Sequence, residues 1–357
     1  MARQQEDGPP EAKRRRIGIE PLPNNPLEEK LVWREPHDTI QMATWNVAGL
    51  ETSNDEKWGH AFRMYVEAED AHVLSITEVK DKDPRKTFER GSDWAFLRSR
   101  YPYRYWSNQV AIVSKLKPVA DPIYGFPEGQ DFDPDEGKER IITLEFKKCF
   151  FIATYVPNSG ENFKSIDRRR KWNSDFERWI RKLDEKKPVI WSGDFNVVRP
   201  YSPTTPRPID KAPHTWKSPD LQRWANWGKV GGTHADEIKA HERLLGPQPQ
   251  LSNPRRPGRK FSDVWRTIHK ETGEYSKQYT HSSKHLGDWR LDGFIVSEPF
   301  LYHVRKCEIR YAWKSVYWGD KAYPVGAASD HWPVWISFEL ERGDFEEENA
   351  IPQKTSK

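Results

Sequence analysis

Apolar residues recur with two different periods along this 357-residue chain, and each period predicts one type of element. From Asp330 to Leu340 the positions alternate, which predicts a strand with one face made of Val334, Ile336, Phe338 and Leu340. After Ser165 apolar residues recur every three or four positions, which predicts a helix whose buried stripe is Trp172, Phe176, Trp179, Ile180 and Leu183. The opposite, polar side of this helix is predicted to carry Arg168, Arg169, Lys171, Arg178 and Lys182.

The same patterning predicts one folded domain between two tails. Strand and helix patterns alternate over residues 37–341 without a linker that would divide them. Residues 1–36 are charged and Pro-rich and are expected to form a disordered basic tail, whereas residues 342–357 are expected to form an acidic disordered tail. Residues 228–260 are rich in Pro, Gly and charge, which predicts a long surface insertion within the domain.

Charge and cysteine content narrow the class of protein only slightly. The net charge of +4 permits a polyanionic partner without demanding one. Cys149 and Cys307 lie in apolar surroundings and are expected to be reduced core residues.

No run approaches the roughly 18 apolar residues of a membrane span, and no secretory signal follows Met1, so we expect a soluble protein without a membrane partner. Residues 13–16 are similar to a nuclear import signal and predict a location in the nucleus, although a solvated charge run is the alternative interpretation.

Five short segments join apolar runs to acidic or amide side chains, and each is expected to end a strand. They are Thr44–Val47, Ser75–Val79, Trp191–Val197, Trp289–Asp292 and Ala328–Trp332. A carboxylate at the end of an apolar run is costly to bury unless it meets a metal ion, a cation or several donors. We therefore expect the five segments to meet at one shared site.

The order and content of six motifs resemble a known family. The motifs are Trp45–Leu50, Ile76–Lys80, Tyr155–Gly160, Gly193–Val197, Trp289–Asp292 and Ser329–His331. Over residues 39–340 the chain is similar to the endonuclease/exonuclease/phosphatase superfamily and, within it, to the exonuclease III type of apurinic/apyrimidinic (AP) endonucleases. The resemblance implies an α/β fold: a four-layer sandwich of two mixed β-sheets packed face to face and flanked by helices.

Phosphodiester cleavage needs an attacking water, stabilisation of charge on the phosphoryl oxygens and help for the leaving oxygen. The resemblance implies that Glu78 holds a divalent cation, with Asn46 and Asp330 as further ligands, directly or through water. Mg²⁺ suits one or two carboxylates plus a substrate phosphate, and Mn²⁺ is an alternative. Whether one or two ions bind stays open. The alternative interpretation of Glu78 is an exposed glutamate at a strand end without a functional role.

Five residues are predicted to be catalytic by the same resemblance: Tyr155, Asp194, Asn196, Asp292 and His331. Asp194 and Asn196 would orient and activate the water, although Asp-x-Asn after a strand is also a common turn. His331 would meet the phosphate while Asp292 fixes its orientation. Either Asp194 or His331 could take the proton of the water. Tyr155 would stabilise charge on the phosphate.

Substrate contacts are predicted for a further set of residues: Lys80, Asn158, Trp289, Arg255, Arg256 and Arg259. The three arginines end the predicted insertion, where cations favour contact with a phosphate backbone.

Four departures from the family pattern affect the expected metal and substrate binding. Ala48 stands where many AP endonucleases have a second acidic ligand, which implies weaker metal binding or a single ion. Glu161 lies near the position of a DNA-inserting Arg in some relatives. The connection from Ser107 to Val110 is short, and the aromatic run that forms the abasic-sugar pocket is altered at residues 275–279.

The predicted function is Mg²⁺-dependent hydrolysis of DNA as a class II AP endonuclease of base excision repair, cutting 5′ to abasic sites. A 3′–5′ exonuclease or 3′-phosphodiesterase activity could accompany it. The expected partner is double-stranded, damaged DNA, and a monomer is expected. Another superfamily hydrolase, acting on RNA, phosphoinositides or undamaged DNA, is the alternative, and a non-catalytic nucleic-acid-binding protein is a second one.

Overall fold

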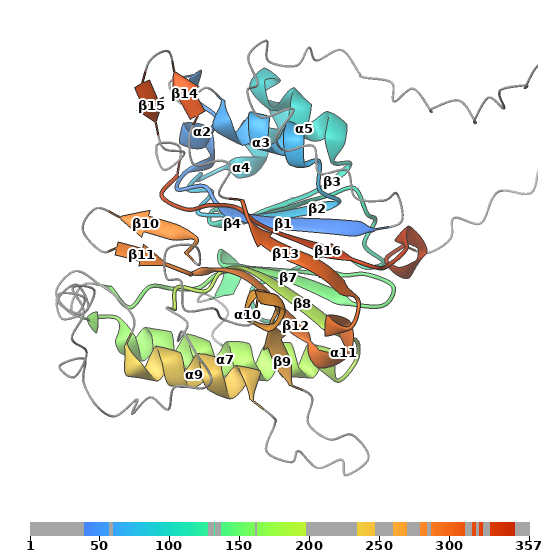
Figure 1. Cartoon of the computed structure of the whole chain (residues 1–357), viewed down its shortest axis with the longest axis vertical. Coiled ribbons are helices and arrows are strands. Elements are labelled where there is room, and N and C mark those ends of the chain that lie inside the picture. Colours follow the sequence, from blue (N-terminus) through green and yellow to red (C-terminus); the bar gives the residue numbers. More distant parts are fainter. Residues whose placement is uncertain are drawn as a thin grey trace, which may run out of the picture.

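Two mixed six-stranded sheets pack face to face in the computed structural model, with helices on both outer faces (Figure 1). The structure describes residues 39–56, 60–127, 132, 137–160, 163–197, 234–246, 260–269, 279–283, 287–310, 316–318, 321–323 and 329–346. Apolar side chains from the facing sides of both sheets belong to one buried cluster, which includes Val73 of the first sheet and Phe151 of the second. This arrangement confirms the predicted four-layer α/β sandwich.

The first sheet has the strand order β13–β16–β1–β2–β4–β3. Its strands are β1 (Ile40–Asn46), β2 (Val73–Thr77), β3 (Tyr103–Trp106), β4 (Val110–Ser114), β13 (Val304–Ile309) and β16 (Val334–Phe338). β1 and β2 run parallel, and the other neighbours run antiparallel. The carboxyl ends of β1 and β2 therefore meet at one edge of this sheet.

The second sheet has the strand order β5–β6–β7–β8–β12–β9. Its strands are β5 (Ile123–Tyr124), β6 (Ile141–Glu145), β7 (Phe150–Tyr155), β8 (Val189–Asp194), β9 (Phe261–Asp263) and β12 (Asp292–Ser297). β7 and β8 form the parallel pair here, and the other neighbours are antiparallel. Contacts of β1 and β2 with β7 and β8 place the parallel pairs of the two sheets against each other.

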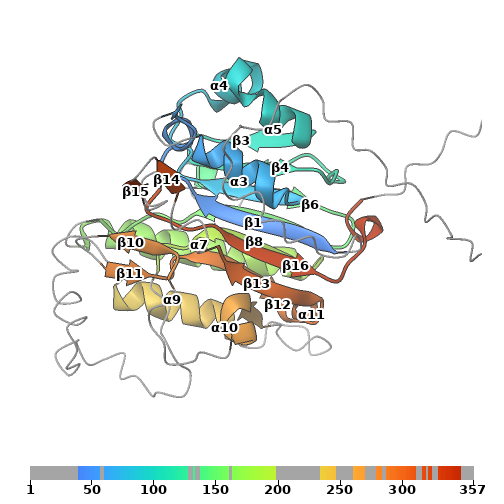
Figure 2. The same ribbon diagram turned by 45° about the horizontal axis from the view of Figure 1, so that its top comes forward.

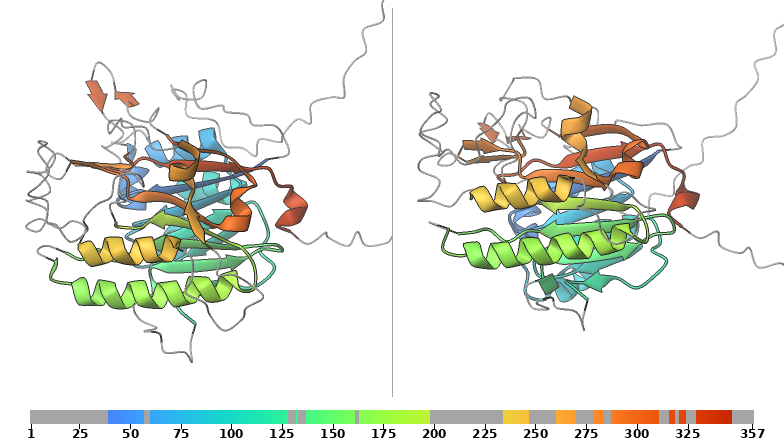
Figure 3. Two further views of the ribbon diagram at one scale, coloured as in Figure 1. Left: turned by 60° about the horizontal axis from the view of Figure 1, so that its bottom comes forward. Right: turned by 90° about the horizontal axis from the view of Figure 1, so that it is seen from below.

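The outer layers are helical. Three helices cover the first sheet: α3 (Ala61–Glu69), α4 (Pro84–Arg90) and α5 (Ala95–Arg100). Two helices, α7 (Ile166–Asp184) and α9 (Ala235–Leu245), lie side by side under the second sheet (Figure 3). Shorter elements are α2 (Leu50–Ser53), α10 (Val264–His269), α11 (Glu298–Leu301), two 3₁₀ turns (Ser92–Trp94 and Arg342–Asp344), and the hairpins β10 (His281–Ser283)–β11 (Gly287–Trp289) and β14 (Val316–Trp318)–β15 (Lys321–Tyr323). The hairpin of β10 and β11 lies beyond the left-hand ends of the sheets (Figure 2).

Helix α7 follows Ser165 as predicted, and all five residues of its predicted apolar stripe are buried. The prediction for Arg169 was wrong, because this side chain is only 2% exposed. Arg169 precedes Trp172 by three positions and Phe176 by seven, so helical geometry places it on the inner face. Its burial requires polar partners, which are described below.

Strand β16 differs from its predicted alternation. It spans Val334–Phe338, and all five of its residues are buried. Alternation is typical of a sheet with one solvated face, but this sheet lies between a second sheet and a helical layer. Ser337 is therefore buried as deeply as Ile336.

Several predicted boundaries differ from the structure or lie outside it. Residues 234–246, within the predicted insertion, include helix α9, which packs on α7. Phe345, in the predicted acidic tail, is 1% exposed and belongs to the core. Residues 1–36 lie outside the described residues.

Smaller expectations can also be compared with the structure. Cys149 and Cys307 are both free thiols and buried, and burial raises the pKa of Cys149 far above its usual range. Among the residues that the structure describes, no helix is both long and apolar enough to cross a bilayer. The short connection after Ser107 closes a hairpin between β3 and β4, in which the Ser107 backbone N–H donates to the Val110 carbonyl at 2.8 Å.

Candidate active site

The five polar segments meet at one edge of the sandwich, although not all of them end a strand. Asn46 ends β1, Glu78 follows the last residue of β2, and Asp194 ends β8. Asp292 instead begins β12, and His331 precedes β16, so these two expectations were wrong. The reason that they still reach the site is strand direction.

Antiparallel pairing puts the start of one strand beside the end of its neighbour. β12 runs antiparallel to β8, and Asp292 pairs directly with Asp194. β16 runs antiparallel to β1, so the segment that precedes it returns to the end of β1 near Asn46. There the Ser329 hydroxyl donates to the Asn46 carbonyl at 2.6 Å. Register thus joins the four chain segments in two pairs, one pair in each sheet, and the packing of β1 against β8 brings the pairs together.

Asn46 joins the two sheets at this edge. Its side-chain Nδ2 donates to Glu78 Oε1 at 3.0 Å and to Asp194 Oδ2 at 2.9 Å. Its Oδ1 accepts from the Ala48 backbone N–H at 3.0 Å. The amide nitrogen of Asn46 therefore lies between the two carboxylates and binds both. Direct metal ligation through Oδ1 would require a rotation of the side-chain amide by about half a turn.

Glu78 is held as a carboxylate. It lies just past β2 in a left-handed backbone conformation with a φ of 54°, which directs its side chain to the edge of the sheet. Burial raises the pKa of Glu78, but the cationic His331, Lys80 and the Asn46 amide together lower it below its usual value. Tyr155 also donates a hydrogen bond to Glu78, and burial with two nearby carboxylates raises the Tyr155 pKa far above its usual range. The phenol therefore keeps its proton as a donor.

Asp194 is 1% exposed, and its pKa is shifted in the opposite direction from that of Glu78. Burial, followed by the charge of Asp292, raises the pKa of Asp194 to about 7. Its Oδ1 accepts from the Asn196 backbone N–H at 2.8 Å. The preceding residue has to be glycine, because a Cβ on Gly193 would lie 2.0 Å from the Thr154 carbonyl oxygen. This close approach packs the end of β8 tightly against β7.

The loop after Asp194 is strained. Asn196 has a φ of 44°, an uncommon conformation for a residue other than glycine. Its Nδ2 donates to the Val156 carbonyl at 2.8 Å, which ties it to the loop that follows β7. The exposed Asn158 lies on that loop and contacts Asn196 Oδ1 through Nδ2 at 3.5 Å. Two loops, residues 156–160 and 195–197, thus form one wall of the site.

His331 and Asp292 form a buried pair, as predicted. His331 Nδ1 donates to Asp292 Oδ2 at 2.7 Å. Burial lowers the pKa of His331, but the charge and hydrogen bond of Asp292, with lesser contributions from Asp194 and Asp330, raise it to about 10. His331 is therefore an imidazolium at neutral pH. Trp45 fixes the backbone at this point by donating its indole N–H to the His331 carbonyl at 3.0 Å.

Two residues of the site were not predicted. Thr280 donates its hydroxyl to Asp292 Oδ2 at 2.6 Å and accepts the Asp292 backbone N–H at 3.0 Å. His281 stacks on Trp289, with ring centroids 5.2 Å apart, and its Nε2 lies 3.3 Å from Asp330 Oδ2. Both residues lie at the start of β10, where the sequence has no strand-length apolar run to mark them.

Two groups of side chains gather potential metal ligands, and His331, which belongs to both, could ligate a metal only after its imidazolium loses a proton. Glu78, Asp194 and His331 place one ligand atom each within 4.8 Å of the others, and His281, Asp330 and His331 do the same. Two carboxylates fit a hard divalent cation, and Glu78 is the one predicted ligand in the first group, because Asp330 lies in the second group and Asn46 points its amide nitrogen at Glu78. Asp330 belongs to the second group, on the exposed side of the imidazole.

The predicted substrate residues are only partly described. Lys80 pairs with Glu78 Oε2 and is half exposed, Asn158 is exposed, and Trp289 lies on the β10–β11 hairpin. The predictions for Arg255, Arg256 and Arg259 lie outside the described residues, as do Glu161 and residues 275–278. Ala48 is described, and it supplies only a backbone donor to Asn46.

The site motifs all lie within the part of the chain that matches a family profile. The profile of the Endonuclease/Exonuclease/phosphatase family matches residues 43–331. The chain belongs to this family. An exodeoxyribonuclease from Bacillus subtilis (strain 168) is 32% identical to it over 274 residues, which cover 76% of this chain and 93% of that relative. A DNA-(apurinic or apyrimidinic site) endonuclease from Dictyostelium discoideum is 30% identical, over 82% of this chain and 71% of that relative.

Solved structures of lower identity share the fold. An AP endonuclease from Archaeoglobus fulgidus has a TM-score of 0.59 at 20% identity, over 84% of this chain and 100% of that chain. A 3′ phosphatase from Neisseria, solved with a product DNA hairpin, has a TM-score of 0.58 at 18% identity, over 84% of this chain and 99% of that one. This likeness supports the four-layer sandwich of the endonuclease/exonuclease/phosphatase family.

Glu78→Gln is expected to weaken cation binding while the fold is retained. The amide keeps a partner for Asn46 but removes the charge that a divalent cation needs. The Mg²⁺ concentration for half-maximal cleavage is expected to rise about tenfold or more, as for other metal sites that lose a ligand or its support. Titration of Mg²⁺ in a single-turnover assay measures this shift, and Glu67→Gln on helix α3, which weakens an ion pair with Arg63 away from the site, is the control. An unchanged Mg²⁺ dependence would remove Glu78 from the metal site.

Proposed function

We propose that the protein is a Mg²⁺-dependent DNA phosphodiester hydrolase that cuts 5′ to abasic sites in base excision repair, with 3′-end trimming as a second activity. The observation that carries the proposal is the bridge from Glu78 through the Asn46 amide to Asp194, beside the His331–Asp292 pair. An anionic and a cationic group thus lie together at one edge of the sandwich, as phosphoryl transfer requires. The names of the two nuclease relatives support DNA as the substrate.

Glu78 would hold the Mg²⁺ ion, which supplies positive charge for the phosphoryl oxygens when bound, and Asp194 lies beside it. Three further side chains would contact the phosphate. Tyr155 keeps its phenolic proton, which it donates to Glu78 in this structure and would turn toward a phosphate oxygen when substrate binds. Asn158, exposed on the neighbouring loop, offers an amide donor to the same group. Lys80 adds a cation at the rim of the site.

Asp194 is the better candidate for the general base. A base must accept a proton, and His331 is already protonated at neutral pH because Asp292 raises its pKa to about 10. Asp194 has a pKa of about 7, close to the pH at which a carboxylate accepts a proton most effectively. His331 would then donate from Nε2 to the phosphate. Asn196 would hold Asp194 in place through its backbone N–H.

A substrate panel tests this function. Purified full-length protein is mixed with Mg²⁺ and five substrates of one sequence: an abasic duplex, an undamaged duplex, a nicked duplex with a blocked 3′ end, single-stranded DNA and RNA. We expect fastest cleavage 5′ to the abasic site and slower release of the 3′ block. Equal rates on all strands would select a general nuclease, and cleavage of RNA alone would select another hydrolase. Binding without turnover would contradict an enzyme.

Nuclear location and a monomeric state belong to the same proposal. Residues 13–16 lie outside the described residues, so the support is their basic sequence alone. Fusion of residues 1–36 to a fluorescent protein tests import, with the four basic residues changed to Ala as the control. Sedimentation of the full chain tests the monomer.

A further inference from the structure

We propose that Arg169 is a positioning residue, whose guanidinium, anchored by Glu237 of α9, holds the two catalytic loops 156–160 and 195–197 in register. The proposal rests on the proposed function, because it assigns Arg169 a part in the same reaction. Arg169 lies on the inner face of α7, one layer below the site, and contacts none of the reacting groups. Its effect would pass through the backbone of the loops.

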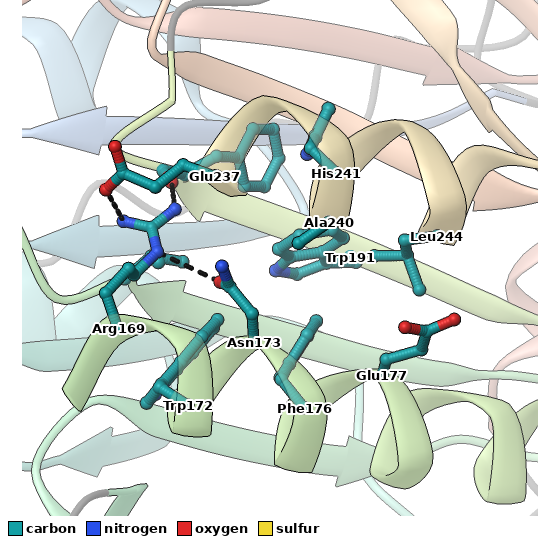
Figure 4. A pocket seen from close by; sticks show the side chains of 12 residues that line it. Arg169, Trp172, Asn173, Phe176, Glu177, Trp191, Glu237, Ala240, His241 and Leu244 are labelled. Carbon is teal, nitrogen blue, oxygen red and sulfur yellow. Dashed lines mark hydrogen bonds and ion pairs between the residues drawn. The ribbon is translucent and has the colours of Figure 1, made fainter. Parts of the chain in front are cut away.

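The hydrogen bonds of Arg169 reach both loops. Its Nη1 donates to the Pro157 carbonyl at 2.5 Å and to the Asn196 carbonyl at 3.2 Å. Its Nη2 donates to the Phe195 carbonyl at 2.9 Å. Its Nε donates to Asn173 on the next turn of α7 at 2.9 Å, which fixes the plane of the guanidinium (Figure 4). One planar group therefore joins three carbonyls from two loops.

Glu237 anchors this group from the other helix. Glu237 is 1% exposed, and its Oε1 lies 3.5 Å from Arg169 Nη1. The same Oε1 accepts the hydroxyl of Ser159, and Oε2 accepts the His234 backbone N–H. Glu237 thus both caps the start of α9 and binds the first loop directly. Figure 4 shows the pair pointing toward each other between α7 and α9.

The loops need such a support because one of them is strained. Asn196 has a φ of 44°, and a strained conformation persists only where its surroundings fix it. Arg169 binds the carbonyls on either side of that residue's N–Cα bond, those of Phe195 and Asn196. Release of these bonds would let Asn196 relax. The backbone N–H that it donates to Asp194 would then move with it.

Stability alone does not account for a buried pair of this type. Burial lowers the pKa of Arg169 to about 10, so the residue still enters the fold as a cation at neutral pH. A buried ion pair contributes little net stability compared with packed apolar side chains. A guanidinium does, however, fix several acceptors in one plane, which a lysine ammonium cannot do. The arrangement is suited to setting geometry.

Arg169→Lys tests the proposal, with Arg181→Lys as its matched control. Arg181 lies on the same helix, is 8% exposed and donates to two carbonyls, those of Arg243 and Leu244, at the far end of α9. Both variants replace a buried guanidinium, with its several fixed donors, by an ammonium group of the same charge. We expect Arg169→Lys to lower kcat on an abasic duplex about 10²-fold with little change in KM, as a misplaced catalytic group does. Arg181→Lys is expected to keep kcat within about threefold at a similar change in Tm.

Amide hydrogen exchange separates this proposal from the proposed function. In Arg169→Lys the amides of Val156 and Asn196, which bond to Asp194, are expected to exchange faster, and in Arg181→Lys they are not. Glu237→Gln is expected to fall between the two. If the wild-type protein cuts no DNA, the exchange result still decides whether Arg169 holds the loops. Unchanged loop exchange, or equal losses of kcat in both arginine variants in proportion to Tm, would overturn the proposal.

Discussion

Asp194→Asn is expected to lower the single-turnover rate of abasic-duplex cleavage by about 10³-fold, within the range for loss of a general base. The amide keeps the shape of the side chain and a partner for the Asn196 backbone N–H. It cannot take a proton from water, and it brings a weaker ligand to the cation. Rapid-quench kinetics at saturating enzyme measure the effect without interference from product release.

The same substitution is expected to remove a pH dependence of stability, while its amide nitrogen can no longer accept the hydrogen bond from Asn46 Nδ2. The pKa of Asp194 is raised to about 7, so the folded protein holds a proton that the unfolded chain releases near pH 4. Ionisation of Asp194 therefore destabilises the fold as the pH rises from about 4 to about 7, and Asn lacks this cost. Urea unfolding of metal-free protein at both pH values tests the sign. An inactive but strongly destabilised variant would assign Asp194 to the fold, and a fully active one would refute its catalytic role.

Asp292→Asn is expected to slow cleavage by about 10²-fold and to lower the pKa of His331. Asp292 makes the largest contribution that raises the His331 pKa to about 10, through charge and a hydrogen bond at 2.7 Å. Without that charge the imidazolium loses its proton at a lower pH. Activity that depends on the His331 imidazolium should therefore begin to fall at a lower pH in Asp292→Asn than in the wild-type protein.

The His331 C2–H resonance of metal-free protein reports this pKa by NMR, with His331→Gln to assign the signal. The wild-type signal is expected to titrate near pH 10, and that of Asp292→Asn at least one pH unit lower, because one unit corresponds to about 1.4 kcal/mol of lost interaction. The matched control is Asp263→Asn, another buried carboxylate with a side-chain partner, Arg290. A His331 that titrates equally in wild-type protein and in Asp292→Asn would contradict the assigned pair.

Local patterning was sufficient to predict helix α7 and a shared polar site. The spacing of Trp172, Phe176 and Leu183 predicted helix α7, and their burial confirms it. Acidic and amide residues at the ends of apolar runs predicted a shared site, because strand ends gather at the edges of sheets. The sandwich itself followed from the motifs that resemble the family, since alternation of strands and helices fits several architectures.

Other features depend on pairing that no local pattern shows. Asp292 begins a strand, and only the antiparallel register with Asp194 brings it to the site. Thr280 and His281 lie in a two-stranded hairpin too short to give a periodic signal. Helical spacing alone would place Arg169 on the inner face of α7. Arginine is so seldom buried, however, that its residue type favoured the exposed face. Its partners, Glu237 and two distant loops, become visible only in three dimensions.

A crystal structure of Asp194→Asn bound to an abasic duplex and Mg²⁺ tests the central claim most directly. The scissile phosphate is expected to lie within hydrogen-bond distance of His331 Nε2 and the Tyr155 hydroxyl. A Mg²⁺ ion is expected at about 2.1 Å from a Glu78 carboxylate oxygen. A duplex bound with its phosphate away from this edge, or a Mg²⁺ ion held without Glu78, would contradict the assignment of the site.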